Sequence, residues 1–312
     1  MRHSERVDFM GEPRRTSTRI LIVGLTPHDA GKTTVARALT SELVSRGYRV
    51  GVSKPIAGHN LWYQRGSVRN SMELGILVGE DAVELKRSSG SEDPVEAINP
   101  VDIALAPLDP EPFLKNLRGY HEALSSMTLS TVMMRITTCM DRKIYTAHYI
   151  VGRRVGRTPA AVRAVIEAIA SRISPKPIDI NPELVEQLAI AGYMGAEACY
   201  RAIAGKHQIL VIESFNDAAS PLIDPGDIDT VLAVTPGKIL LYSGAQYLNT
   251  LRVVTSVEGS IYRRWWPSTS EILKYIKPLD IMDIPYIEYI DKFGEFSEKL
   301  TDRVIRKIEA IS

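Results

Sequence analysis

Three short apolar segments recur along the chain, and stretches with helical spacing of apolar residues lie between and after them. The apolar segments are RILIVGL (19–25), HQILVIES (207–214) and DTVLAVT (229–235). Apolar runs of this length are typical of parallel strands that are buried on both faces. The stretch at 32–47 repeats apolar residues at helical spacing and ends at a glycine, which predicts a helix.

The alternation of strands and helices continues beyond this first helix. Residues 48–58 (YRVGVSKPIAG) are predicted to form the next strand, which completes a strand–helix–strand unit. The stretch at 237–252 is predicted to be helical, and the chain closes with the apolar stretch 284–290 and an amphipathic helix at 295–311. This alternation predicts an α/β fold with a doubly wound, mainly parallel sheet.

The composition is that of a globular protein with one large core or two moderate ones. Of the 312 residues, 45% are apolar and 24% are charged. The formal net charge of +1 gives no whole-molecule field that attracts nucleic acid or membrane, and no apolar run approaches the length of a membrane span. Residues 1–18 are basic but lack an apolar stretch, so we expect a flexible tail rather than a signal peptide, followed by one domain at 19–312.

The two cysteines, Cys139 and Cys199, lie far apart in the sequence and lack metal-ligand spacing. We therefore expect neither a disulfide framework nor a zinc site, and a reducing, cytoplasmic location.

The segment GLTPHDAGKTT (24–34) joins the first predicted strand to the first predicted helix, which is the context of a phosphate-binding P-loop. In such a loop, backbone N–H groups and the positive helix end hold the phosphates, Lys32 reaches the β/γ oxygens, and the Thr33 hydroxyl takes a Mg²⁺ position. The residues expected to bind the nucleotide are Thr26, Pro27, His28, Asp29, Ala30, Gly31, Lys32, Thr33 and Thr34.

The loop departs from the usual pattern in its first half. Thr26 stands where the first glycine is expected, Pro27 lacks a backbone donor, and His28 and Asp29 carry large polar side chains. These two side chains either face the γ-phosphate or a second substrate, or point into solvent.

The chain resembles the dethiobiotin synthetase branch of P-loop proteins. In that family a threonine also begins the loop, and the next strand ends in Lys-Pro, here Lys54-Pro55. The other similar segments, in the family's order, are VRNSMEL (68–74), INPVDIALAPLDP (98–110), VIESFNDAASPL (211–222) and KPLDIMDIPYI (277–287). The resemblance covers about half of the chain and implies a P-loop NTPase fold, ATP with Mg²⁺, and a homodimer.

The resemblance also assigns site residues. Lys54 is expected to act beside Lys32 as a second cation for phosphate or substrate, and Glu213, at the end of its apolar strand, is expected to hold the metal or its water. The family's metal-binding aspartate is replaced by Met72, so Glu73 is the third, displaced candidate for the metal.

Other family positions differ more strongly. Asp109 and Glu111 replace a substrate-binding Ser-Pro-His signature, and Thr255 and Ser256 stand where the family has an asparagine that recognises adenine. We therefore expect nucleotide chemistry but not dethiobiotin formation.

Two further groups of residues can each be interpreted in more than one way. Asn216 and Asp217 either orient the attacking group or shape a turn. RRWW (263–266) either packs between helices, which is favoured, or stacks a base or binds a partner.

Residues 113–205 lack close similarity to the family and are expected to form an α+β insertion. A hairpin is predicted around MDRK (140–143), and Thr158 is predicted to cap a helix with Pro159 at its first position. The basic residues between 135 and 172 either form a solvated face or receive an anionic substrate or nucleic acid. They are Arg135, Arg142, Lys143, Arg153, Arg154, Arg157, Arg163 and Arg172.

Three functions are compatible with these residues. The first is an enzyme that uses Mg²⁺-ATP to phosphorylate or activate a small carboxylate or carbamate, with Lys32, Lys54 and Glu213 as catalytic residues. The second is an NTP-hydrolysing switch that acts on a protein or nucleic-acid partner. The third, with weaker support, is a polynucleotide-directed kinase or ATPase.

Overall fold

The structure is a computed structural model that describes residues 17–27, 29–257, 267–286 and 290–311. Most of the predicted tail at 1–18, together with His28 and RRWW (263–266), therefore lies outside the described residues.

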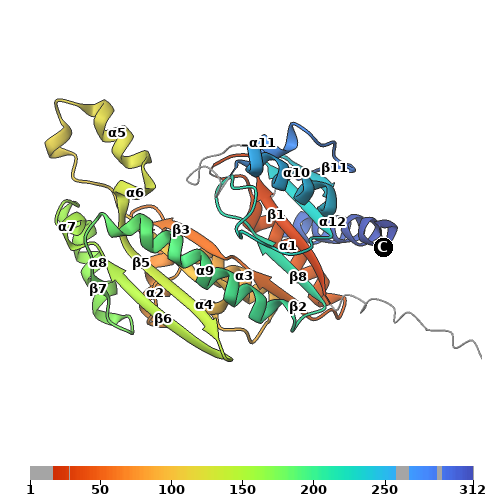
Figure 1. The fold of residues 1–312 in the computed structure, drawn as a ribbon, viewed down its shortest axis with the longest axis horizontal. Helices are drawn as coiled ribbons and strands as arrows, with labels where there is room; N and C mark the ends of the chain where they lie inside the picture. Colours follow the sequence, from red (N-terminus) through yellow and green to blue (C-terminus); the bar gives the residue numbers. More distant parts are fainter. Residues whose placement is uncertain (1–16, 28, 258–266, 287–289, 312) are drawn as a thin grey trace, which may run out of the picture.

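The first of two sheets contains the three predicted apolar strands. Six strands follow one another in the order β11-β10-β9-β1-β8-β2 (Figure 1). Their bounds are β1 Thr18–Gly24, β2 Val50–Ser53, β8 Ile209–Glu213, β9 Thr230–Thr235, β10 Lys238–Ser243 and β11 Asp280–Asp283. The four strands β9, β1, β8 and β2 are parallel, whereas β10 and β11 are antiparallel to their neighbours. The prediction of buried parallel strands at the centre of the sheet is thus confirmed.

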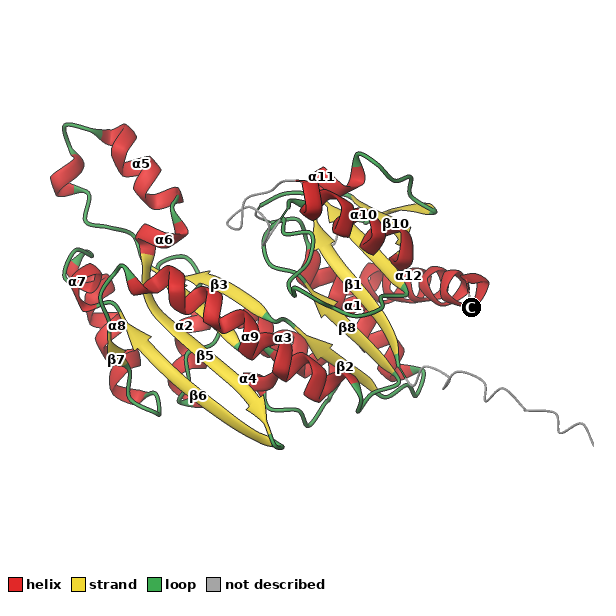
Figure 2. Ribbon diagram, in the orientation of Figure 1, coloured by secondary structure: helices red, strands yellow, loops and turns green. Residues whose placement is uncertain are grey.

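Helices pack around this sheet (Figure 2). Helix α1 (Lys32–Ser45) contacts α3 (Glu80–Ser89) and the last helix, α12 (Ile290–Ile311), while α10 (Gly244–Val257) contacts β9, β10 and α11 (Thr269–Leu273). The prediction of a helix from residue 237 onward is wrong in its first half, because residues 238–243 pair with β9 as strand β10 and the helix begins only at Gly244.

The second sheet is mixed, with the order β3-β4-β5-β6-β7. Its strands are β3 Ile56–Asn60, β4 Val101–Leu105, β5 Thr131–Met140, β6 Lys143–Ile150 and β7 Ile178–Asp179. The pairs β3–β4 and β6–β7 are parallel, and β4–β5 and β5–β6 are antiparallel. The single mainly parallel sheet that we expected is therefore two sheets, although the α/β class is confirmed.

The predicted strand at 48–58 is divided between the two sheets. It forms β2 in the first sheet and β3 in the second, and Lys54 and Pro55 lie between them. Proline has no N–H to donate to a ladder, and the Lys54 N–H donates instead to the carbonyl of Ile98. The chain therefore passes from one sheet to the other at the dipeptide that the family resemblance singled out.

Residues 113–205 are built into this second sheet. The predicted hairpin is confirmed as β5 and β6, and β5 also pairs with β4, which precedes the segment. The helices around the second sheet are α2 (Arg65–Leu74), α4 (Val95–Ile98), α5 (Leu117–Ser125), α6 (Met127–Ser130), α7 (Gly152–Val155), α8 (Ala160–Arg172) and α9 (Leu184–Ala204), with a 3₁₀ turn at Glu111–Phe113. Helix α9 packs on β4 and β5, and one apolar core continues from the first sheet through α9 into the second.

The predicted cap of α8 is wrong in detail. The helix begins at Ala160, Pro159 is its N-cap residue, and no side chain caps it. The Thr158 hydroxyl donates instead to the carbonyl of Val155, so it closes the preceding turn.

Within the described part of the chain, no helix is long and apolar enough to cross a membrane.

Candidate functional site

Three strand ends of the first sheet meet at one edge. Ile22 of β1 is in register with Glu213 of β8, and Ser53 of β2 is in register with Ile212 of β8. The β1–α1 loop (25–31), Glu213 and Lys54 consequently leave the sheet side by side, at the carboxyl ends of parallel strands. In open α/β sheets this edge is where ligands bind.

The β1–α1 loop ends in backbone conformations that favour glycine and short polar residues. Gly31 is the N-cap residue of α1 with φ +88°, and Asp29 has φ +51°. Gly24 is required for a different reason, because a Cβ there would lie 2.8 Å from both the carbonyl oxygen of Asn216 and Nζ of Lys32. The backbone at the end of β1 therefore lies directly against the segment that follows β8.

Lys32 extends along this close contact. Its Nζ donates to the carbonyl oxygen of Asn216 at 2.6 Å, and burial lowers the pKa of Lys32. Asn216 itself has φ +45°, and the carbonyl of Asp217 accepts hydrogen bonds from the backbone and hydroxyl of Thr269. These contacts of Asn216 and Asp217 are made by backbone atoms, which favours the turn-shaping interpretation over a role in orienting an attacking group.

Glu213 is the centre of a group that we call the Glu213 cluster, formed by Thr33, Lys54, Asp81 and Glu213. Its side chain is 1% exposed. Oε1 accepts a hydrogen bond from the Thr33 hydroxyl at 2.7 Å and from Lys54 Nζ at 2.6 Å. Oε2 is buried and has no hydrogen-bond partner among the described residues. A buried carboxylate oxygen in this state has an unused acceptor that a cation or a ligand donor would satisfy.

Lys54 connects this carboxylate to a second one. Its Nζ also lies 3.2 Å from Oδ2 of Asp81, which stands in the first turn of α3 and is 42% exposed. Burial by itself would lower the pKa of Lys54, but the two carboxylates raise it well above its usual value. In turn, Lys54 holds the pKa of Asp81 below its usual value. Lys54 and Asp81 are therefore both charged at neutral pH.

Asp81 was not predicted from the sequence. An acidic pair at the start of a helix is commonly explained by its favourable interaction with the positive helix end, so Glu80-Asp81 gives no distinct functional signal. Its place beside Lys54 depends on how α3 packs against β2 and α1.

The oxygen atoms that the cluster offers as metal ligands suit Mg²⁺ that is bound together with phosphates. Mg²⁺ prefers hard oxygen ligands and usually keeps several waters, with one or two carboxylates and substrate phosphates. The Thr33 hydroxyl and the unpartnered Oε2 of Glu213 supply such oxygens, with Asp81 on the other side of Lys54. No group of three or more histidine, cysteine or carboxylate side chains among the described residues suits a metal by itself. Mg²⁺ at the Thr33 hydroxyl and Glu213 Oε2 would need further oxygen ligands such as waters or phosphates.

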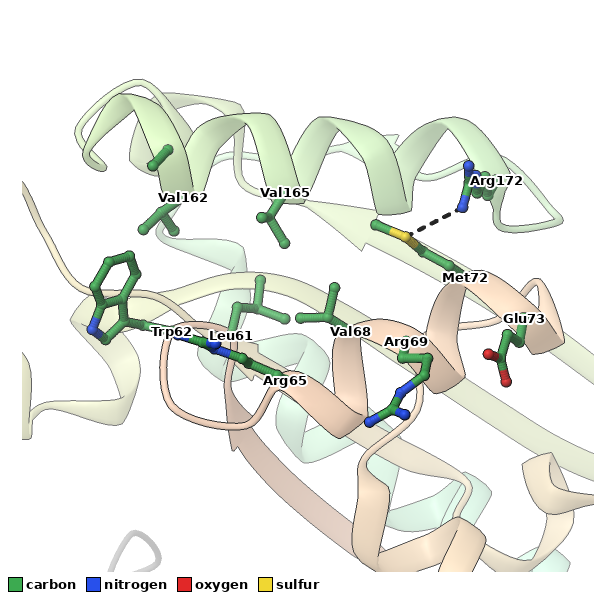
Figure 3. A pocket seen from close by; sticks show the side chains of 11 residues that line it. Leu61, Trp62, Arg65, Val68, Arg69, Met72, Glu73, Val162, Val165 and Arg172 are labelled. Carbon is green, nitrogen blue, oxygen red and sulfur yellow. Dashed lines mark hydrogen bonds between the residues drawn. The ribbon is translucent and has the colours of Figure 1, made fainter.

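Glu73, the predicted third metal residue, does not belong to the Glu213 cluster. It is exposed on α2 and lines a cavity between α2 and α8, close to Met72 and Arg172 (Figure 3). The opposite side of α2 faces α3, because the hydroxyl of Ser67 accepts a hydrogen bond from the N–H of Glu80. The orientation of α2 therefore directs Glu73 away from α3, and Asp81 is the second carboxylate beside Lys54.

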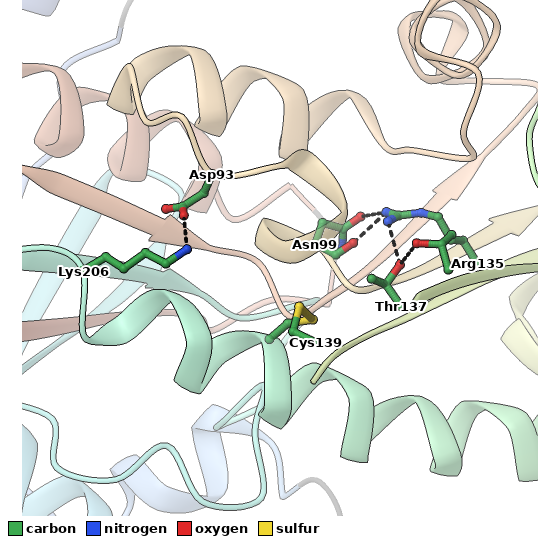
Figure 4. The surroundings of a disulfide bond; sticks show 8 residues. Asp93, Asn99, Arg135, Thr137, Cys139 and Lys206 are labelled. Carbon is green, nitrogen blue, oxygen red and sulfur yellow. Dashed lines mark hydrogen bonds and ion pairs between the residues drawn. A yellow bond between two sulfur atoms is a disulfide. The ribbon is translucent and has the colours of Figure 1, made fainter. Parts of the chain in front are cut away.

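Two residues of the predicted basic surface are structural. Arg135 is fully buried and donates to the carbonyls of Leu77 and Asn99 and to the side chains of Asn99 and Thr137 (Figure 4). Arg154 is buried as well and donates to backbone carbonyls at residues 131 and 182. Their prediction as ligands of an anionic acceptor is wrong, because backbone carbonyls already use their donors.

The prediction that the cysteines are unpaired is also wrong. Cys139, near the end of β5, forms a disulfide with Cys199 of α9, and the two Cα atoms are 4.7 Å apart (Figure 4). Gly195 allows this close approach, since a Cβ there would lie 2.5 Å from the carbonyl oxygen of Thr137. The bond removes the cysteine-based argument for a reducing compartment, because disulfides persist mostly in oxidising environments.

The other predicted positions, Asp109, Glu111, Thr255 and Ser256, make their contacts outside the Glu213 cluster. Asp109 accepts a hydrogen bond from the N–H of Glu111 in the turn after β4. Thr255 and Ser256 lie on α10 and line a cavity of about 460 Å³ together with Ser220 and residues 222–225.

Comparisons of the chain with protein-family models, with curated proteins and with solved structures gave no match. The resemblance to the dethiobiotin synthetase branch accordingly remains one of sequence motifs.

Proposed function

We propose that the protein is a Mg²⁺-dependent ATP-binding enzyme that transfers the γ-phosphoryl group to, or activates, a small carboxylate- or carbamate-type acceptor. The observation that carries the proposal is the Thr33–Glu213–Lys54 contact at the carboxyl ends of three parallel strands, next to a glycine-capped helix that begins with Lys32. A hydroxyl, a carboxylate and two ammonium groups at a helix N-terminus are the groups that phosphoryl transfer requires for positioning and charge neutralisation.

Each residue has a distinct role in this proposal. The N–H groups at the start of α1 and the ammonium of Lys32 bind the phosphates, for which Lys32 exchanges its hydrogen bond to Asn216 for phosphate oxygens. Thr33 and Glu213 would hold Mg²⁺, which supplies neutralisation of the phosphate charge. Lys54 stays protonated between Glu213 and Asp81 and stabilises the charge that develops between the transferred group and the acceptor.

The sequence motifs bear on which nucleotide is used and on which reaction is excluded. ATP is preferred because the family that the chain resembles uses it. Dethiobiotin formation is expected to be absent or very slow, because Asp109 and Glu111 place carboxylates where that family has a substrate-binding serine and histidine.

One contact favours a second candidate function, a nucleotide-driven switch. Lys32 is bonded to the backbone of the segment that follows β8, so a nucleotide that draws Lys32 away releases this segment. Hydrolysis would then be reported to a partner through the conformation of residues 215–219.

The test is nucleotide binding and turnover in Lys32→Ala, with Lys238→Ala as the matched control. Lys238 is a half-exposed surface lysine that pairs with Asp283. We expect Lys32→Ala to lose turnover at least 100-fold with an unchanged circular dichroism spectrum, and Lys238→Ala to keep wild-type turnover. Equal hydrolysis by Lys32→Ala and wild type would refute the proposal.

Product analysis distinguishes the two candidates. Formation of ADP together with a phosphorylated or activated small molecule supports the transferase, whereas hydrolysis that only a macromolecular partner stimulates supports the switch. Displacement of ATP by a lower concentration of GTP would overturn the preference for ATP.

A further inference from the structure

The second sheet carries a cavity that the proposed function does not use. It lies between α2 and α8 and has a volume of about 530 Å³, within the range of ~300–1,000 Å³ that is typical of small-molecule sites. None of its lining residues belongs to the β1–α1 loop or to the Glu213 cluster. Its occupant is therefore a question separate from the nucleotide.

The inner walls of the cavity are aliphatic. Val68 of α2 faces Val162 and Val165 of α8, and Leu61 closes the inner side (Figure 3). Met72 lies at the far end, where its sulfur contacts Arg172 at 3.4 Å. Such walls suit an unbranched aliphatic chain, because its transfer out of water is favourable along its whole length.

The α2 side of the cavity's rim carries two arginines. Arg65 and Arg69 are four residues apart on α2, so they are neighbours on the helix surface. Both are exposed, and neither forms an ion pair with any described residue. Arg65 is also the first residue of α2, where a cation is unfavourable beside the positive helix end and a bound anion would relieve that cost.

We propose that this cavity binds a free aliphatic carboxylate of medium chain length. The carboxylate lies against Arg65 and Arg69, and the chain extends between Val68 and Val165 towards Met72. A guanidinium donates two parallel hydrogen bonds to a carboxylate, which gives this head group an advantage over a neutral one. Glu73 is the one acidic residue of the lining and lies one turn beyond Arg69 on α2, next to Met72, so Arg65 is the arginine farther from it (Figure 3).

The first experiment uses the wild-type protein without nucleotide. Decanoate and decanol are titrated by isothermal calorimetry at low ionic strength. We expect saturable one-to-one binding of decanoate and an affinity for decanol at least tenfold lower, since the alcohol keeps the chain but lacks the charge. Equal affinities, or no saturable binding of decanoate at millimolar concentration, would overturn the proposal.

The second experiment assigns the binding to this cavity. The variant Arg65→Gln/Arg69→Gln should bind decanoate at least tenfold more weakly, and Val165→Trp, which fills the space between the helices, should abolish binding. Arg118→Gln is the matched control, because Arg118 is an exposed arginine of α5 outside the cavity. Unchanged binding in both cavity variants would place the ligand elsewhere and refute the assignment.

The outcome is independent of the proposed enzyme activity. Lys32→Ala should bind decanoate as wild type does, so failure of either proposal leaves the other standing.

Discussion

Replacing Lys54 with methionine tests the charge arrangement at the centre of the candidate site. Lys54 is 4% exposed and its Nζ lies 2.6 Å from the Glu213 carboxylate. At an effective dielectric constant of ~20, two unit charges at this distance attract each other by about 6 kcal/mol. The cost of burying both ions offsets much of this attraction, so the intact pair adds little net stability.

Removing the lysine alone is expected to cost much more stability than the intact pair contributes. Glu213 is then a buried carboxylate without its cation, and Asp81 adds a second negative charge nearby. Breaking a buried pair in this way costs about 3–5 kcal/mol, which lowers the melting temperature of a protein of this size by roughly 5–8 °C. Glu213→Gln should cost less, because Lys54 keeps Asp81 as a partner.

Urea unfolding followed by circular dichroism at pH 7 measures these free energies. Lys238→Met is the control, since the exposed pair that it breaks should contribute less than ~1 kcal/mol. The double variant Lys54→Met/Glu213→Gln should recover more than half of the free energy of unfolding that Lys54→Met alone loses. A loss below ~1 kcal/mol for Lys54→Met, or a double variant that shows the sum of both single losses, would refute the reasoning.

Three other predictions follow from the described contacts. The pKa of Asp81 lies below its usual 3.8 in the folded state, so its contribution to stability is present above that pH and is lost as the pH falls below it. The free energies of unfolding of wild type and Asp81→Asn, measured with urea, should therefore converge as the pH falls below about 3.8. Cys139→Ser/Cys199→Ser should lower the free energy of unfolding by about 4 kcal/mol, the chain-entropy value for a bridge between residues 60 apart, and the same melting temperature as wild type under oxidising conditions would contradict the bond. Gly24→Ala should weaken nucleotide binding at least tenfold by equilibrium dialysis, because its Cβ meets two atoms at 2.8 Å, whereas Gly205→Ala, with open space around it, should bind normally.

Much of the first sheet could be predicted from the sequence. Strands β1, β8 and β9 each form a local apolar run, and any such run is most stable when it is buried on both faces of a sheet. Lys32 and Thr33 follow β1 after the β1–α1 loop and Glu213 ends β8, so their proximity follows once those two strands are neighbours. Such strands and the site residues next to them can be predicted because they depend only on short stretches of the sequence.

Other features depended on contacts between distant segments. Asp81 reaches Lys54 only because α3 packs beside β2, and Arg135 becomes a buried donor only because the fold brings the carbonyls of Leu77 and Asn99 next to it. The pairing of Cys139 with Cys199 likewise requires α9 to lie against β5. A residue's type shows which interactions it is able to make, but burial and partner choice are set by the packing of whole elements, and only the tertiary structure decides them.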